Sequence, residues 1–158
     1  MSTLNLPKTG APAPEFTTVN QNEETVSLKD FRGKKVILYF YPKAMTPGCT
    51  TQACGLRDSK AELEKRNAVA LGISPDAPKR LVKFIDKESL NFDLLSDEDH
   101  SIADKFGVWG LKKFMGREFD GIHRITFIID EEGKLAHVME KVKTKSHHDD
   151  VLAVLDSL

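Results

Sequence analysis

The stretch VILYFYPKAMTPGCTTQAC, residues 36–54, decides the fold of this chain. Its first six residues are aliphatic or aromatic, which predicts a strand buried on both faces of a parallel sheet. Pro42 ends that strand because proline has no N–H group to donate to a ladder. Thr46 followed by Pro47 is typical of a helix start with threonine as the N-cap, and we expect the helix to run to about Arg66.

Both cysteines of the chain, Cys49 and Cys54, fall inside this predicted helix. With Thr46 as the N-cap, Cys49 is the third helical residue, and its sulfur comes within reach of the Thr46 hydroxyl. The unpaired N–H groups and the dipole of a helix N-terminus stabilise a thiolate, so we expect a lowered pKa for Cys49. Cys54 lies more than a turn further along and should be the less acidic thiol.

The spacing of the two cysteines limits their chemistry. Residues five apart on an α-helix have α-carbons about 8.6 Å apart, whereas a disulfide needs about 4.4–6.8 Å. A Cys49–Cys54 disulfide therefore requires the first turns of the helix to unwind. This favours a division of labour in which one thiol attacks an oxidant and its sulfenic acid later condenses with the other. The alternative is two unrelated cysteines, one buried and one incidental.

The pattern Pro42-x-x-x-Thr46-x-x-Cys49 resembles the peroxiredoxin signature. A second cysteine five residues later on the same helix is similar to the bacterioferritin comigratory protein (peroxiredoxin Q) branch, close to its enterobacterial type. Further segments resemble that branch from near the N-terminus almost to the C-terminus: Tyr39–Lys43, Gly55–Asp58, Leu95–Asp97, Phe106–Gly110 and Ile122–Arg124.

The resemblance implies a thiol-dependent peroxidase acting on hydrogen peroxide and organic hydroperoxides. It makes Cys49 the peroxidatic cysteine, with Thr46 bonded to the thiolate and the peroxide, and Pro42 shielding the sulfur from water. It implies that Arg124 lowers the pKa of the thiol and stabilises the transition state. Cys54 would resolve the sulfenic acid to an intramolecular disulfide, which a thioredoxin-type protein would then reduce.

The order of predicted elements indicates an α/β fold with a mixed central sheet flanked by helices and an N-terminal hairpin. This order is compatible with a thioredoxin-like fold, which the resemblance also implies, in one domain spanning residues 1–158. The expected strands are 16–19, 25–28, 36–41, 68–74, 92–95, 125–129 and 134–139, and later helices are expected at 78–87, before residue 106 and around 151–155.

Composition and charge exclude several classes of protein. A formal net charge of −1 gives no reason to expect general affinity for nucleic acid or anionic membranes. The chain has no run of roughly 18–20 apolar residues and no signal-peptide core, so we expect a cytoplasmic location. No metal is expected because the thiols have no nearby histidines, and no cofactor is needed for the chemistry. A monomer is expected by resemblance.

Other polar residues have ordinary interpretations. Arg124, taken alone, indicates a solvated charge at a strand edge, and only the resemblance assigns it to the site. His147 and His148 indicate a capping or surface position rather than a metal site. Gln52, one turn beyond the first cysteine, is expected to line the entrance, and residues 112–117 are expected to form a loop.

Two further functions fit thiol chemistry at a helix start. A redox-sensing or holdase-like binding protein would use the two cysteines to switch a surface. A disulfide reductase or isomerase is disfavoured because an intact helix keeps the thiols apart. Turnover with a thioredoxin system separates a peroxidase from the first alternative, and disulfide reduction without peroxide would favour the second.

Overall fold

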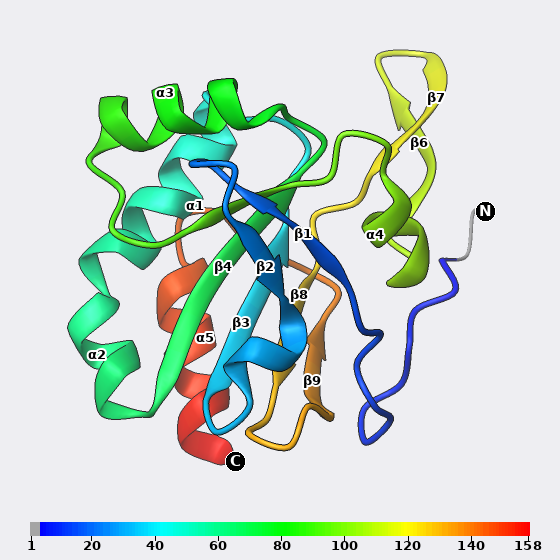
Figure 1. Cartoon of the computed structure of the whole chain (residues 1–158). Coiled ribbons are helices and arrows are strands. Elements are labelled where there is room, and N and C mark those ends of the chain that lie inside the picture. The colour runs from blue at the N-terminus through cyan, green and yellow to red at the C-terminus, as the bar shows by residue number, and fades with distance from the viewer. Residues whose placement is uncertain (1–3) are drawn as a thin grey trace.

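A seven-stranded mixed sheet forms the centre of the structure, a computed structural model that describes residues 4–158. Its strand order is β2-β1-β5-β4-β3-β8-β9 (Figure 1). The neighbours β3, β4 and β5 run parallel, whereas β1 and β8 add antiparallel pairs on either side. The strands of this sheet are β1 Thr17–Asn20, β2 Thr25–Ser27, β3 Lys35–Phe40, β4 Ala68–Ser74, β5 Leu94–Ser96, β8 Thr126–Ile129 and β9 Leu135–Met139. The expected mixed sheet and N-terminal hairpin are confirmed.

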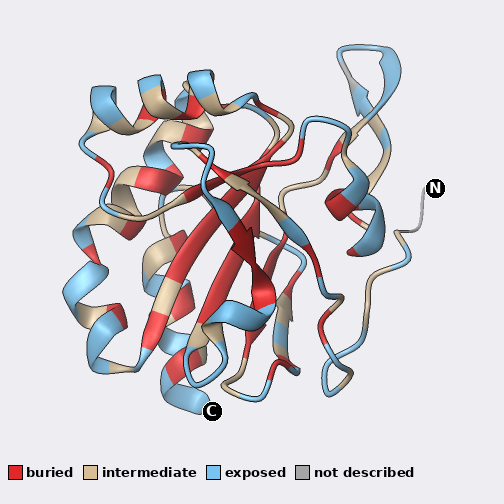
Figure 2. Ribbon diagram, in the orientation of Figure 1, coloured by how far each residue is buried: buried red, intermediate tan, exposed pale blue. Residues whose placement is uncertain are grey.

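Side-chain alternation along β3 divides the core into two layers. Ile37 and Tyr39 point to the face covered by α1, α2, α3 and α5, whereas Leu38 and Phe40 pack on the other face with residues around α4 and the N-terminal segment. Both faces of the central strands are buried, as Figure 2 shows. The helices are η1 Leu28–Phe31, α1 Pro47–Asp58, α2 Lys60–Lys65, α3 Pro78–Glu88, α4 Ser101–Lys105 and α5 His147–Ser157.

Two predicted segments differ in the structure. The helix expected to reach Arg66 is interrupted at Ser59, which separates α1 from α2. The loop expected at 112–117 is wrong, because those residues belong to a hairpin of β6 (Trp109–Phe114) and β7 (Arg117–Ile122). Its two-residue turn, Met115-Gly116, has positive φ at both positions, which suits a tight antiparallel connection.

The β6–β7 hairpin stands apart from the central sheet (Figure 1). None of the helices within residues 4–158 is long and apolar enough to cross a lipid bilayer. The start of α1 lies close to the end of β3, because only a short loop joins them. The residues of the predicted site lie around this loop.

Candidate active site

Cys49 lies where the sequence predicted, as the third residue of α1. Thr46 has extended N-cap backbone angles and its carbonyl accepts the first helical bond, from the Thr50 N–H group at 2.9 Å. The Cys49 side chain is only 1% exposed and packs in the core layer beneath α1. Its thiol is not in a disulfide. A buried sulfur at a helix N-terminus faces oriented N–H groups rather than bulk water.

The side chain of Arg124, 75 residues further along the chain, contacts the Cys49 sulfur. Its Nη2 group donates a hydrogen bond to Cys49 Sγ at 3.3 Å, and its Nη1 group donates to Gln52 Oε1 at 2.6 Å. Arg124 lies two residues before β8, which pairs antiparallel with β3, so the sheet brings it to the end of the strand that feeds α1. A guanidinium in this position forms a charge-assisted hydrogen bond with a thiolate.

The loop between β3 and α1 carries the two remaining residues of the predicted motif. Pro42 follows the strand and is half-buried. The Thr46 hydroxyl donates to the Lys43 carbonyl at 2.9 Å in this structure, so its bond to Cys49 stays a prediction. Met45 has φ of 66°, a conformation uncommon for a residue with a side chain.

A buried carboxylate holds the same loop. Asp76 Oδ2 accepts from the Ala44 N–H group at 2.7 Å and from the Ser74 hydroxyl at 2.8 Å. Arg80 completes the clamp, with Nε 3.2 Å from Asp76 Oδ1 and Nη2 donating to the Ala44 carbonyl at 2.9 Å. Both backbone groups of Ala44 are therefore fixed, one by Asp76 in the loop after β4 and the other by Arg80 on α3, which rigidifies the approach to the helix start.

Cys54 lies on the same helix, as predicted, and is partly exposed. Its thiol donates a weak hydrogen bond to Glu88 Oε1 at 3.7 Å. Burial is the main cause that raises the pKa of Cys54, and the Glu88 carboxylate adds to the increase while Arg57 opposes it. With α1 intact, helix geometry keeps the two α-carbons about 8.6 Å apart.

Two expectations about polar residues are wrong. Gln52 does not line an entrance, because it is fully buried between Arg124 and His147. His147 is not at the surface either: it is fully buried and bonded to Gln52 and Thr126. The sequence offered little signal for this, since a helix-start histidine is usually exposed and the partners lie far apart along the chain.

Lys112 interacts electrostatically with Arg124 and Cys49, and the sequence analysis did not identify it because residues 112–117 were expected to form a loop. It lies on β6 and its Nζ group donates to the Ile122 carbonyl at 2.7 Å. Burial is the main cause that lowers the pKa of Lys112; the positive charge of Arg124 lowers it further and Cys49 opposes both. The hairpin therefore brings a second cation near the sulfur. Within residues 4–158, no three His, Cys, Asp or Glu side chains gather closely enough to hold a metal ion.

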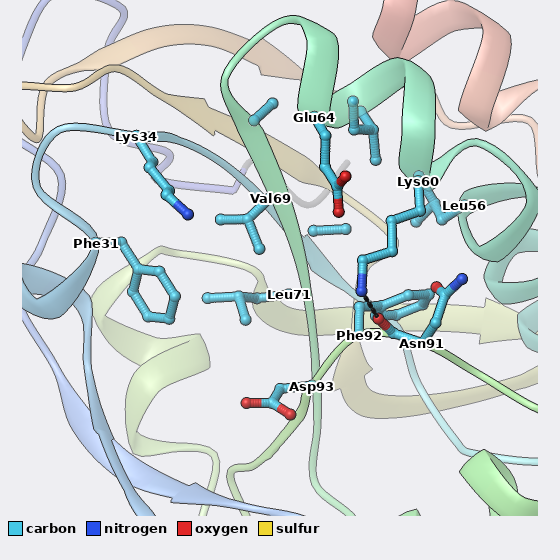
Figure 3. A pocket seen from close by; sticks show the side chains of 13 residues that line it. Phe31, Lys34, Leu56, Lys60, Glu64, Val69, Leu71, Asn91, Phe92 and Asp93 are labelled. Atoms are coloured by element: carbon cyan, nitrogen blue, oxygen red, sulfur yellow. Dashed lines mark hydrogen bonds between the residues drawn. The ribbon is translucent and has the colours of Figure 1, made fainter.

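A pocket of about 330 Å³ lies elsewhere, between α1, α2, β4 and the segments that precede β3 and β5 (Figure 3). Its walls combine Phe31, Val69 and Phe92 with charged side chains such as Lys34 and Asp93. None of its lining residues belongs to the predicted site. The candidate catalytic residues therefore lie around α1 and outside this pocket.

The chain is similar over most of its length to proteins of one family. Residues 9–138 match the family described as AhpC/TSA. The chain is 62% identical over 155 residues to the putative peroxiredoxin bcp of Haemophilus influenzae, covering 98% of this chain and 100% of that protein. It is 57% identical over 149 residues to peroxiredoxin Bcp of Escherichia coli K12, covering 94% and 96%. A peroxiredoxin Q structure from Xanthomonas campestris superposes with a TM-score of 0.86 at 32% identity, covering 98% and 97%.

Proposed function

Because this chain belongs to the AhpC/TSA family, as a thiol peroxidase of the Bcp peroxiredoxin branch, we propose that Cys49 is its peroxidatic cysteine. The Cys49 thiolate attacks one peroxide oxygen, forming an S–O bond while the O–O bond breaks. The second oxygen leaves as water or an alcohol after taking a proton. Turnover with a thioredoxin system would distinguish this peroxidase from the redox-sensing or holdase-like alternative.

The observation that carries this proposal is the Arg124 guanidinium, 3.3 Å from a buried sulfur at a helix N-terminus. During the displacement, negative charge moves from sulfur to the leaving oxygen. A fixed cation and oriented N–H groups stabilise that charge without reorganising. Thr46 at the N-cap supplies a hydroxyl to the peroxide, and Pro42 keeps water from the sulfur.

We propose that Cys54 resolves the sulfenic acid. Its thiol attacks the Cys49 sulfur, forming the disulfide and releasing water. The step requires α1 to unwind over residues 49–54, because the helix holds the thiols beyond disulfide reach. A dithiol protein of the thioredoxin type then reduces the disulfide. Since such reductants work in reducing compartments, we propose that this cycle takes place in the cytoplasm. We also propose that the protein is a monomer with a single domain, residues 1–158.

Intact mass after one equivalent of hydrogen peroxide, quenched over milliseconds to seconds, tests the cycle. We expect a rapid loss of two hydrogens that thioredoxin reverses. Cys49→Ser should not consume peroxide, whereas Cys54→Ser should gain oxygen and progress to higher oxidation states. The reverse pattern, with Cys54→Ser inert and Cys49→Ser reactive, would exchange the two assignments.

Two further measurements separate the parts of the mechanism. Arg124→Gln should slow oxidation of Cys49 by about 100-fold, because it removes the cation that stabilises the developing charge. Disulfide formation should raise amide exchange in residues 49–54, as the helix opens. Unchanged protection in the oxidised protein would mean that the disulfide forms without unwinding, against the helix geometry.

A further inference from the structure

A series of buried hydrogen bonds links Arg124 through Gln52 and His147 to Thr126; we call it the polar chain. Gln52 of α1, His147 at the start of α5 and Thr126 of β8 are all fully buried. Gln52 Nε2 lies 3.2 Å from His147 Nδ1, and His147 Nε2 lies 2.8 Å from Thr126 Oγ1. Gln52 and His147 lie on α1 and α5, which both pack into an apolar core cluster. Polar groups in such surroundings cost stability unless they are fully bonded, so each group in this chain depends on its neighbours.

The hydrogen-bond directions along the chain are set from one end. Arg124 can only donate, so the Gln52 oxygen must face it and the Gln52 NH₂ group must face His147. His147 Nδ1 then accepts, and its Nε2–H group donates to the Thr126 hydroxyl. This pattern requires a neutral imidazole. Burial, the main cause, lowers the pKa of His147 to about 4, so the neutral form is present at pH 7.

We propose that His147 is a positioning residue for peroxide reduction: its Nδ1 atom keeps the Gln52 amide oxygen turned toward Arg124, and so holds the guanidinium on the Cys49 sulfur. An amide has two unlike ends. If Gln52 rotated by half a turn, its NH₂ group would oppose the guanidinium, donor against donor. Rotation would therefore cost the Arg124–Gln52 hydrogen bond, and His147 Nδ1 holds the amide against rotation by accepting from its NH₂ group. The inference rests on the function proposed for Cys49 and Arg124.

Two substitutions of His147 separate positioning from general packing. His147→Leu removes the acceptor, and we expect the rate constant for Cys49 oxidation by hydrogen peroxide to fall about tenfold, the worth of one buried hydrogen bond. His147→Asn can place its amide oxygen at the Nδ1 position, so it should stay within about threefold of wild type. The rate of disulfide reduction by a dithiol should be unchanged in both, because that step does not use Arg124.

Val151→Ala is the matched control on α5. Val151 is fully buried on the same helix and lies outside the polar chain. It should lower the unfolding midpoint through lost packing and leave the oxidation rate at the wild-type value. If His147→Leu does not fold, His147→Gln replaces it, because the longer amide reaches Thr126 but leaves no acceptor at the Nδ1 position. We expect the same tenfold loss.

A double-mutant cycle with Gln52→Leu gives the decisive result. If His147 acts through Gln52, the His147→Leu substitution should have no further effect on oxidation once Gln52 is gone. An equal loss in both backgrounds, or no loss in the wild-type background, would overturn the positioning role. Arg124→Gln separates this from the function itself: fast oxidation in that variant refutes the proposed mechanism, whereas slow oxidation with a normal His147→Leu variant refutes only the inference.

Discussion

Acidification should destabilise this protein through one buried side chain, His147. Burial is the main cause that lowers its pKa, from 6.5 to about 4; Asp150 raises it, and Arg124 and His148 lower it further. The unfolded chain therefore binds a proton at a higher pH than the folded chain does. The contribution of His147 to stability is complete above about pH 6.5 and is lost as the pH falls toward 4.

The size of the effect follows from the pKa difference. One pKa unit corresponds to about 1.4 kcal/mol, so a fall of roughly 2.5 units limits the loss to about 3 kcal/mol. Between pH 7 and pH 5 the linkage relation gives a loss of about 2 kcal/mol. That is a large part of the 5–15 kcal/mol by which a typical domain is stable.

Urea unfolding of the reduced wild type and of His147→Asn, followed by circular dichroism at pH 7 and pH 5, measures this loss. Carboxylates shared by both proteins cancel in the comparison, including Asp97, whose pKa is raised mainly by burial. We expect the stability advantage of wild type over the variant to shrink by about 2 kcal/mol at the lower pH. An advantage that stays constant would show that His147 is not buried as a neutral imidazole.

Three substitutions test the packing and the loop that support the site. Gly72→Ala should cost about 1–3 kcal/mol in urea unfolding, because the added carbon would lie 2.8 Å from a fully buried tyrosine ring. Gly55→Ala should stay within about 1 kcal/mol of wild type by the same assay: its carbon would meet the movable His148 ring, and alanine favours the helix. A larger loss would mean that the ring cannot move aside. Asp76→Asn should cost about 1–3 kcal/mol in urea unfolding. It should also slow the oxidation of Cys49 by peroxide in stopped-flow measurements, because it weakens the hydrogen bond to the Ala44 N–H group. An unchanged oxidation rate would show that this hydrogen bond does not contribute to catalysis.

Local patterns in the sequence were sufficient for much of the fold. The predicted strand at 68–74 coincides with β4, and the start of α1 follows Thr46-Pro47 as expected. Proline, capping residues and apolar runs act over a few neighbours, so they can be interpreted without knowing the rest of the chain. The β6–β7 hairpin was missed because its turn, Met115-Gly116, begins with a residue that rarely adopts positive φ.

The sequence by itself therefore determined most of the elements, the place of Cys49 at a helix start and the separation that forbids a disulfide in the intact helix. Only the tertiary structure decided what surrounds that sulfur. The pairing of β3 with β8 brings Arg124 across 75 residues to Cys49, and the packing of α5 buries His147 against Gln52. The reason is physical: hydrogen bonds between residues far apart in the chain depend on strand register and helix packing, and no short pattern encodes those.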